Sequence, residues 1–195
     1  MKTTIIIVIS LMTALALKSQ TYNYLVDFRQ SDILWTAKKV GGEHTGSIKI
    51  KSGKFTVENG LITKGDFVVD MSSITNSDIK DESTNNSLLK HLKSPDFFDV
   101  EKFPEAKLEI TGSEKSDGEF YEAKAQLTIK DVSMPYNFRY AYKNDEGKFV
   151  AMSSMTINRA NFNVKYGSES FFKNLGDKVI YDNFDLKVSL IGKPL

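Results

Sequence analysis

Hydrophobic and polar residues alternate along most of the chain beyond its first twenty positions. In one stretch, Ala106, Leu108 and Ile110 are separated by the charged Lys107 and Glu109. A period of two is typical of a strand that buries one face and exposes the other. About eight to ten such stretches follow one another, so the sequence predicts an all-β chain.

Turn sequences separate these stretches. Asn59-Gly60 indicates a two-residue hairpin because both residues tolerate positive φ. Ser116-Asp117-Gly118 and the Asn-Asp-Glu-Gly run at 144–147 are similar turn signals. Short consecutive antiparallel strands form a barrel or a sandwich, and the pattern alone does not separate the two. No repeat, linker or second domain is visible, so a single domain over residues 20–195 is expected.

One stretch breaks the alternation with a helical pattern. Leu88, Leu89 and Leu92 lie at helical spacing, which predicts about two turns with one apolar stripe. Pro95 ends this helix, because the residue before a proline is disfavoured in the α region. Asp96-Phe97-Phe98-Asp99 follows. We interpret residues 88–104 as a lid over one end of the β structure; the alternative is a connection that merely packs the core.

The first residues are expected to be a secretory signal peptide. Lys2 supplies a positive start, and residues 5–17 form an apolar run too short to span a bilayer comfortably. Small residues follow, so cleavage is expected after Ala16 or Ser19, which makes residues 1–19 the signal peptide. The alternative is an uncleaved anchor or a buried helix. No transmembrane span is expected after cleavage, and the mature protein is expected to be periplasmic or secreted.

Composition argues against several function classes. Lys and Arg number 26 against 25 Asp and Glu, without a block of like charge, so neither nucleic acid nor an anionic membrane surface is an expected partner. Cysteine is absent, which excludes disulfides and thiolate chemistry. The two histidines, His44 and His91, have no metal-ligand spacing and no nucleophile motif beside them. We therefore expect no metal, no cofactor and no enzyme activity, although nothing in the sequence excludes a pair of glycosidase carboxylates.

Three segments resemble the YceI-like family: HLKSPDFFDVEKFP with the following EAKLEIT (91–111), AQLTIKDVSMPYNFRY (125–140) and INRANFNV (157–164). The resemblance covers roughly residues 22–193. It implies a lipocalin-like closed barrel in a periplasmic or secreted protein, some relatives binding polyisoprenoid-type lipids in an elongated cavity. An Arg-Asp pair common in the family before His-Leu is absent here, where Asn85, Asn86 and Ser87 stand, so a headgroup role for that pair is in doubt.

Small residues gather on the inward faces of three predicted neighbouring strands, at Ala106, Ala123, Ala125, Ala151 and Ser153. A barrel of about eight strands is just filled by its side chains, so small residues on part of the wall would leave an apolar slot. The alternative is that small residues pair with large ones across the barrel and fill it.

A long apolar ligand would contact the inward strand faces, the lid and the mouth. Arg159 is favoured for an anionic head because its planar fork pairs with phosphate or carboxylate, with His91 and Asn158 as further candidates. The alternative is that Arg159 pairs with an aspartate or caps loop carbonyls. The residues expected to bind the ligand are Trp35, Phe67, Val69, Leu88, His91, Leu92, Phe97, Phe98, Leu108, Ala123, Ala125, Leu127, Tyr140, Phe149, Ala151, Ser153, Met155, Arg159 and Phe184.

Two hypotheses for the function follow. The first is an exported carrier that sequesters a long isoprenoid or related lipid inside the barrel. The second is an envelope or adhesion module with a filled barrel, for which the paired aromatics Phe171 and Phe172 would be a contact patch. A hydrolase or isomerase has the least support. The sequence leaves open the identity of the ligand and whether the chain forms a homodimer.

Overall fold

The computed structural model describes residues 20–195, so the expected signal peptide at 1–19 lies outside the described residues. The strands are β1 (Thr21–Val26), β2 (Asp32–Lys39), β3 (Gly42–Glu58), β4 (Leu61–Asp70), β5 (Glu105–Lys115), β6 (Phe120–Ile129), β7 (Val132–Asp145), β8 (Lys148–Asn158) and β9 (Ile180–Pro194). The helix α1 spans Glu82–Lys93, and short 3-10 turns lie at Met71–Ser73, Arg159–Phe162 and Gly176–Lys178.

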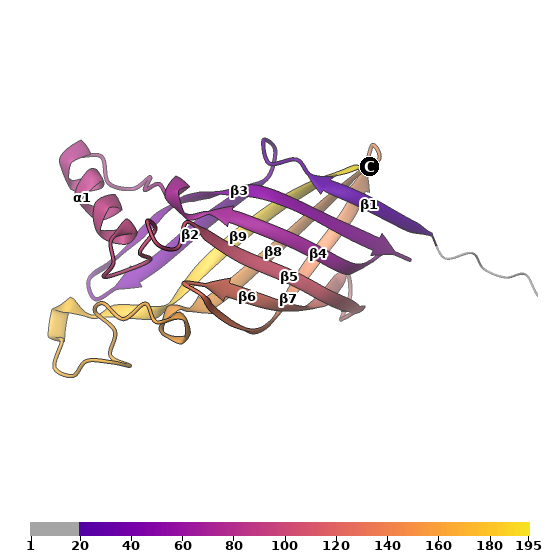
Figure 1. Cartoon of the computed structure of the whole chain (residues 1–195). Helices are drawn as coiled ribbons and strands as arrows, with labels where there is room; N and C mark the ends of the chain where they lie inside the picture. The colour runs from indigo at the N-terminus through magenta and orange to yellow at the C-terminus, as the bar shows by residue number, and fades with distance from the viewer. Residues whose placement is uncertain (1–19) are drawn as a thin grey trace, which may run out of the picture.

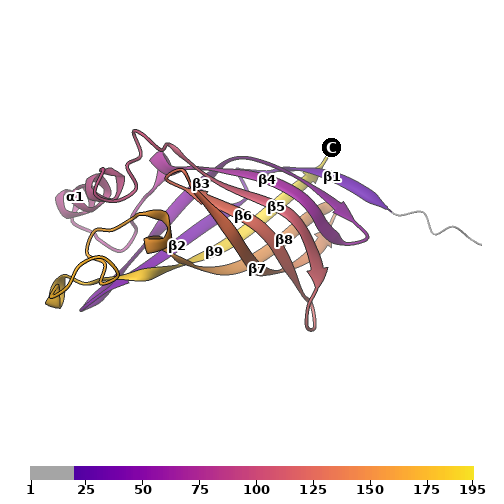
Figure 2. The same cartoon turned by 60° about the horizontal axis from the view of Figure 1, so that its bottom comes forward.

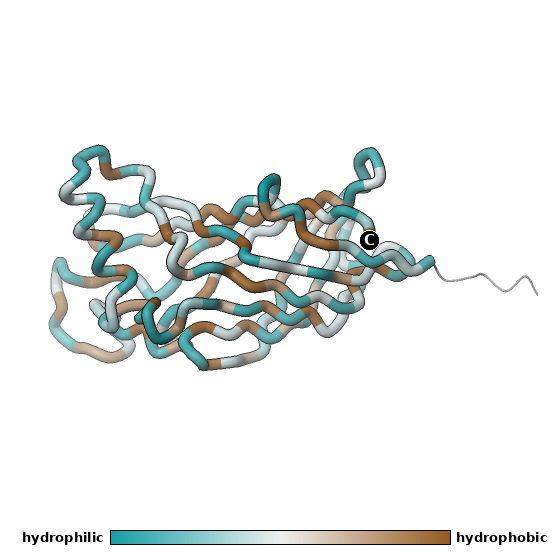
Figure 3. The backbone as a smooth tube through the Cα atoms, turned by 45° about the horizontal axis from the view of Figure 1, so that its top comes forward, coloured by the Kyte–Doolittle hydropathy of each residue, from teal (hydrophilic) through white to brown (hydrophobic). Residues whose placement is uncertain are grey.

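The strands form a closed antiparallel barrel (Figure 1). Eight of them follow the order β3-β2-β9-β8-β7-β6-β5-β4, and pairing of β3 with β4 closes the circle. The prediction of a single antiparallel barrel of about eight strands with one inserted helix is therefore confirmed. Hydrophobic and hydrophilic positions alternate along the strands (Figure 3), which places one apolar face of each strand inside the barrel.

The ninth strand, β1, extends the wall where β2 stops. β2 pairs with β3 and β9 at the end of the barrel that carries α1, and β1 pairs with the same two strands at the opposite end. The chain breaks between them, where Ser31 Oγ accepts the Ile191 N–H at 2.9 Å and Lys193 pairs with Asp27 at 2.7 Å. β1 and β2 therefore occupy one strand position of the barrel wall, each over part of its length.

Helix α1 is longer than the sequence pattern predicts. It ends before Pro95 as expected, but it begins at Glu82 rather than near Leu88. Asp81 caps it by accepting the Thr84 N–H at 2.8 Å. After Glu82, the first turn consists of serine, threonine and asparagine, which have low intrinsic helix propensity and no apolar side chain that would mark the start of the helix.

Strand β7 contains a proline, Pro135, in its first half. The first half of β7 pairs only with β6, and pairing with β8 starts at Tyr140. A proline lacks an N–H and is tolerated where a strand has one partner. The β6–β7 turn at Lys130 and Asp131 has positive φ at both residues and contains no glycine, so it gave no turn signal.

The two ends of the barrel differ in what covers them. Figures 1 and 2 place α1 and the 159–179 segment at one end, and β1 with the C-terminus at the other. Aromatic side chains fill the β1 end, where Phe55 lies 5.1 Å from Tyr24 and 5.2 Å from Phe149 between ring centroids. The α1 end has a separate apolar cluster, which includes Leu127, Ile157 and the residues of the lid.

Candidate ligand cavity

A cavity of about 350 Å³ occupies the α1 end of the barrel. Ligand pockets typically have volumes of roughly 300–1,000 Å³, so this one is large enough for a small ligand or part of a long one. Its barrel wall consists of Ile33, Trp35, Ala37, Ile48, Val69, Ala106, Leu127, Ile129, Ile157, Phe184 and Leu186. Its cover consists of Met71, Ile74, Leu88, His91, Leu92, Phe97, Phe98, Tyr166 and Ile180. Lys38, Lys39, His44, Arg159 and Tyr181 complete the lining.

Ten of the nineteen residues expected to bind the ligand line this cavity. They come from the lid, from four strands (β2, β4, β6 and β9) and from the end of β8, and are Trp35, Val69, Leu88, His91, Leu92, Phe97, Phe98, Leu127, Arg159 and Phe184. The lid residues and the barrel wall thus meet as the lid hypothesis requires. Whether they contact a ligand stays a prediction.

The other nine do not line the cavity. They are Phe67, Leu108, Ala123, Ala125, Tyr140, Phe149, Ala151, Ser153 and Met155. Of the small residues expected to leave a slot, only Ala106 lines the cavity, whereas Ala123, Ala125 and Ala151 are buried in the same cluster as Phe55 and Phe149. Small residues pair there with large ones and fill the barrel, which is the alternative that the sequence left open.

Fifteen lining residues are not among the nineteen expected ligand contacts. Period-two alternation could have found the wall positions Ile33, Ile48, Ile129, Ile157 and Leu186, since all lie on inward strand faces. No local signal marks Tyr166, which lies in the irregular stretch before β9, or Tyr181, which lies at the start of β9, and both are distant in sequence from the lid. Only the tertiary fold brings these two groups together.

Trp35 is held in the wall by a close backbone approach. Its indole Nε1–H donates to the Thr75 carbonyl at 3.1 Å. Gly46 makes this approach feasible, because a Cβ at that position would lie 2.7 Å from the Trp35 ring. The chain has one tryptophan, so its indole reports on the cavity alone.

The lid meets the 159–181 segment through aromatic rings. The His91 ring lies 4.4 Å from Tyr166 and 5.5 Å from Phe97 between centroids, edge-on in both cases. The Arg159 guanidinium stacks over Phe97 at 5.2 Å. These contacts join the lid to the 159–181 segment above the cavity.

The Arg159 side chain makes its polar contacts with other residues of the chain. It is 3% exposed, and it donates to the carbonyls of Val164 and Ile180, each at 2.8 Å, and of Tyr181 at 3.3 Å. Asp182 lies 3.4 Å from the same guanidinium. Burial lowers the pKa of Arg159, and the Asp182 charge opposes that shift. Arg159 thus fixes the irregular start of β9, and its donors are used within the chain.

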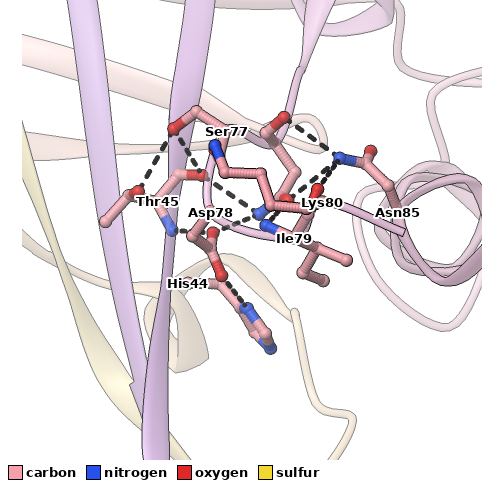
Figure 4. Close-up of polar contacts among 8 residues, drawn as sticks. His44, Thr45, Ser77, Asp78, Ile79, Lys80 and Asn85 are labelled. Atoms are coloured by element: carbon pink, nitrogen blue, oxygen red, sulfur yellow. Dashed lines mark hydrogen bonds and ion pairs between the residues drawn. The ribbon is translucent and has the colours of Figure 1, made fainter. Parts of the chain in front are cut away.

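His44 and Asp78 anchor the loop that leads into α1 (Figure 4). The Asp78 carboxylate accepts the Thr45 N–H at 2.8 Å and lies 2.8 Å from His44 Nδ1. Asn85 on α1 donates to the Ile79 carbonyl at 3.0 Å. Burial alone would raise the pKa of Asp78, but the hydrogen bonds from Thr45, His44 and Asn76 outweigh it and lower the pKa to about 2.

The part of the chain that the structure describes contains neither a cluster of metal ligands nor a membrane-spanning helix. Among residues 20–195, no group of three or more His, Asp or Glu side chains is arranged to hold a metal ion. Over the same residues, no helix has the length and apolar content required to cross a membrane.

Solved structures of low sequence identity share this fold. BcnA of Burkholderia cenocepacia superimposes with a TM-score of 0.65 at 18% identity, covering 85% of this chain and 98% of that one. A polyisoprenoid binding domain from Saccharophagus degradans, implicated in plant cell wall breakdown, gives a TM-score of 0.64 at 13% identity, covering 88% and 98%. These likenesses support the barrel architecture.

Sequence relatives match over shorter stretches. A UPF0312 protein of Photorhabdus laumondii is 34% identical over 93 residues, which is 46% of this chain and 44% of the relative. A UPF0312 protein of Pseudomonas putida strain W619 is 37% identical over 59 residues, 30% of each chain. The matches therefore span less than half the length of these relatives. The family model for the YceI-like domain, in contrast, matches residues 24–191, and the chain belongs to the YceI-like family.

Proposed function

We propose that this protein binds the apolar tail of a lipid, of the isoprenoid or a related class, in the cavity beneath the lid, and that it acts as a carrier rather than an enzyme. The observation that carries the proposal is the cavity of about 350 Å³, whose barrel wall is made of aliphatic and aromatic side chains. An apolar cavity stays dry or takes an apolar ligand. The competing hypothesis of an envelope module requires a filled barrel, and this barrel is filled at one end only.

The energetics favour a ligand with a substantial tail. Burial of one CH₂ group contributes about 0.8 kcal/mol, so a fifteen-carbon prenyl chain would contribute about 12 kcal/mol. Association costs at least about 4 kcal/mol in lost freedom. The difference corresponds to a Kd in the range of about 1 μM, with no strong polar contact required.

Family membership and the shared fold support the same ligand class. The Saccharophagus degradans domain of this fold is a polyisoprenoid binding domain, and by analogy we assign a ligand of that class to this chain. We also propose that residues 1–19 are removed on export and that residues 20–195 act in the periplasm or outside the cell, where a soluble carrier for a lipid is needed.

Access to the cavity requires the lid to move. No residue of α1 is buried, whereas Phe97 and Val100 beyond it are. Elements with few buried contacts open at the lowest free-energy cost. We therefore assign the opening motion to α1, with the 159–181 segment as the fixed side.

The test uses Trp35 as a built-in reporter on residues 20–195. Farnesol, a fifteen-carbon neutral prenyl alcohol, is titrated while tryptophan emission is followed, and a saturable change with a Kd in the micromolar range is expected. Extraction of the purified protein with organic solvent, followed by mass spectrometry, identifies any lipid acquired in the host.

A cavity-filling variant supplies the control. Ala106→Phe places a ring in the cavity and should reduce farnesol affinity at least about tenfold. Ala141→Phe adds the same ring on the outer face of β7 and should leave the affinity unchanged. Unchanged affinity in Ala106→Phe, with a folded protein by circular dichroism, contradicts binding in this cavity.

A further inference from the structure

The charged residues of the cavity lining all carry nitrogen. Lys38, Lys39, His44, His91 and Arg159 line it, and no aspartate or glutamate does so. The chain as a whole has nearly equal numbers of basic and acidic residues, 26 and 25. A lining with no carboxylate in such a chain indicates a preference for negative charge in whatever occupies the cavity.

Three of these five residues are already engaged within the protein. Arg159 donates to three carbonyls and lies beside Asp182. His44 pairs with Asp78 at 2.8 Å. His91 packs edge-on between the rings of Phe97 and Tyr166. None of the three is the obvious partner for a ligand.

Lys38 and Lys39 remain. Both are exposed, and within residues 20–195 neither amine makes an ion pair or a side-chain hydrogen bond. Glu43 is the cross-strand partner of Lys38 on β3, yet the two side chains form no ion pair. These two lysines therefore lie at the rim of an apolar cavity without a carboxylate at ion-pair distance.

An irregularity in the sheet explains why two consecutive residues of one strand both reach the cavity. Ala37 pairs with Phe184 of β9 and Lys39 pairs with Ile180, so one residue of β2 lies opposite three of β9. Such bulges occur at barrel rims and redirect side chains. The hydrogen bonds from Arg159 to the carbonyls of Ile180 and Tyr181 hold this irregular stretch in place.

We propose that the ligand carries an anionic head, a phosphate or a carboxylate, that lies between Lys38 and Lys39 at the mouth while its tail fills the cavity. The inference rests on the proposed function, because it places the head relative to a tail bound under the lid. A lysine amine binds phosphate and carboxylate as a point charge, so two adjacent amines suit a group with several anionic oxygens.

The test compares three probes with the same fifteen-carbon prenyl tail: farnesol, farnesoic acid and farnesyl phosphate. Trp35 emission gives each Kd on residues 20–195. The wild-type protein should bind at least one anionic probe about tenfold more tightly than farnesol, and the tighter of the two identifies the head as carboxylate or phosphate. Added salt should weaken only the anionic probes.

Variants test whether Lys38 and Lys39 cause the preference for an anionic probe. The double variant Lys38→Gln/Lys39→Gln should lose the roughly tenfold preference for the anionic probe and keep the farnesol affinity within about twofold. Lys187→Gln removes a charge from an exposed position on the same barrel, outside the cavity lining, and should change neither. The filling variant Ala106→Phe should weaken all three probes if the tail lies where we place it.

Each outcome decides one of the two proposals. Equal affinities for the three probes in the wild-type protein, or an anion preference that survives in the double variant, overturns the inference on the head and leaves the lipid-binding proposal intact. Failure of all three probes to change Trp35 emission overturns both. An anion preference that disappears in the double variant and persists in Lys187→Gln supports the assignment.

Discussion

At the β1 end of the barrel, the rings of Tyr24, Phe55 and Phe149 lie within 5.6 Å of one another, whereas at the α1 end the same wall encloses about 350 Å³ of space. The strands run through both ends, and their inward positions alternate in the same way. The difference lies in which inward positions carry rings that cross the barrel and which carry aliphatic side chains or rings held against the wall. The cavity therefore results from the size and orientation of the inward side chains at the α1 end, and not from a change in strand arrangement.

Glycines assist the filled end. A Cβ at Gly65 would lie 2.7 Å from the Phe67 ring, so the absence of a side chain lets that ring lie flat on the sheet. At the α1 end, the large ring of Trp35 lies against the wall and bonds to Thr75, rather than crossing the interior. Packing at the filled end thus contributes to the free energy of unfolding. The hollow end lacks such packing contacts, and a bound ligand would supply them.

Truncation of one phenylalanine at each end gives the largest predicted contrast. Phe149→Ala should lower the free energy of unfolding by about 3–5 kcal/mol, since Phe149 is fully buried among other rings. Phe184→Ala, at the cavity wall, should cost clearly less, because part of that side chain already faces empty space. Urea unfolding of the two variants measures both values, and equal losses would contradict the division into a filled and a hollow end.

Removal of Arg159 should weaken the cover of the hollow end. Arg159→Met leaves the Val164 and Ile180 carbonyls and the Asp182 carboxylate without their partner, at a predicted cost of about 3 kcal/mol. Hydrogen exchange should accelerate across residues 159–182 more than at the β1 end. Lys124→Met, at an exposed ion pair with Glu114, is the control and should cost less than about 1 kcal/mol.

Loss of the helix cap should affect only the lid side. Asp81→Ala removes the acceptor of the Thr84 N–H, which should destabilise α1 by about 1 kcal/mol. We expect faster amide exchange in α1 with little change at the β1 end. Asp81→Asn, which keeps a capping oxygen, should restore most of the protection; failure to do so would assign the effect to the charge.

The smallest predicted effect is a pH dependence confined to the loop before α1. The pKa of Asp78 in the folded protein, about 2, is below its ordinary value of 3.8. The carboxylate therefore contributes its full stabilisation above pH 3.8 and loses it as the pH falls through about 2. Asp78→Asn should remove this part of the acid sensitivity of the loop, as followed by hydrogen exchange near Thr45, and an unchanged profile would exclude Asp78 as its source.

The sequence by itself determined the strands, most of the turns and the end of the helix. Period-two alternation depends on local solvent exposure, and Asn59-Gly60 and Pro95 act through their own backbone preferences. The family resemblance further indicated a closed barrel, which pairing of β3 with β4 confirmed. The start of α1 at Glu82 was missed because a capping aspartate and polar residues leave no periodic signal.

Only the tertiary structure decided where the barrel is hollow. Phe149 and Phe184 are both inward aromatics in the alternation, yet one lies in the filled cluster and the other on the cavity wall. The sequence indicated Arg159 as a candidate for a ligand headgroup. Its hydrogen bonds to carbonyls up to 22 residues away along the sequence are visible only in the folded structure. Alternation indicates which face of the sheet a side chain lies on. Whether the interior is filled depends on the side chains on the opposite wall of the barrel, and pairing between strands far apart in the chain decides which side chains those are.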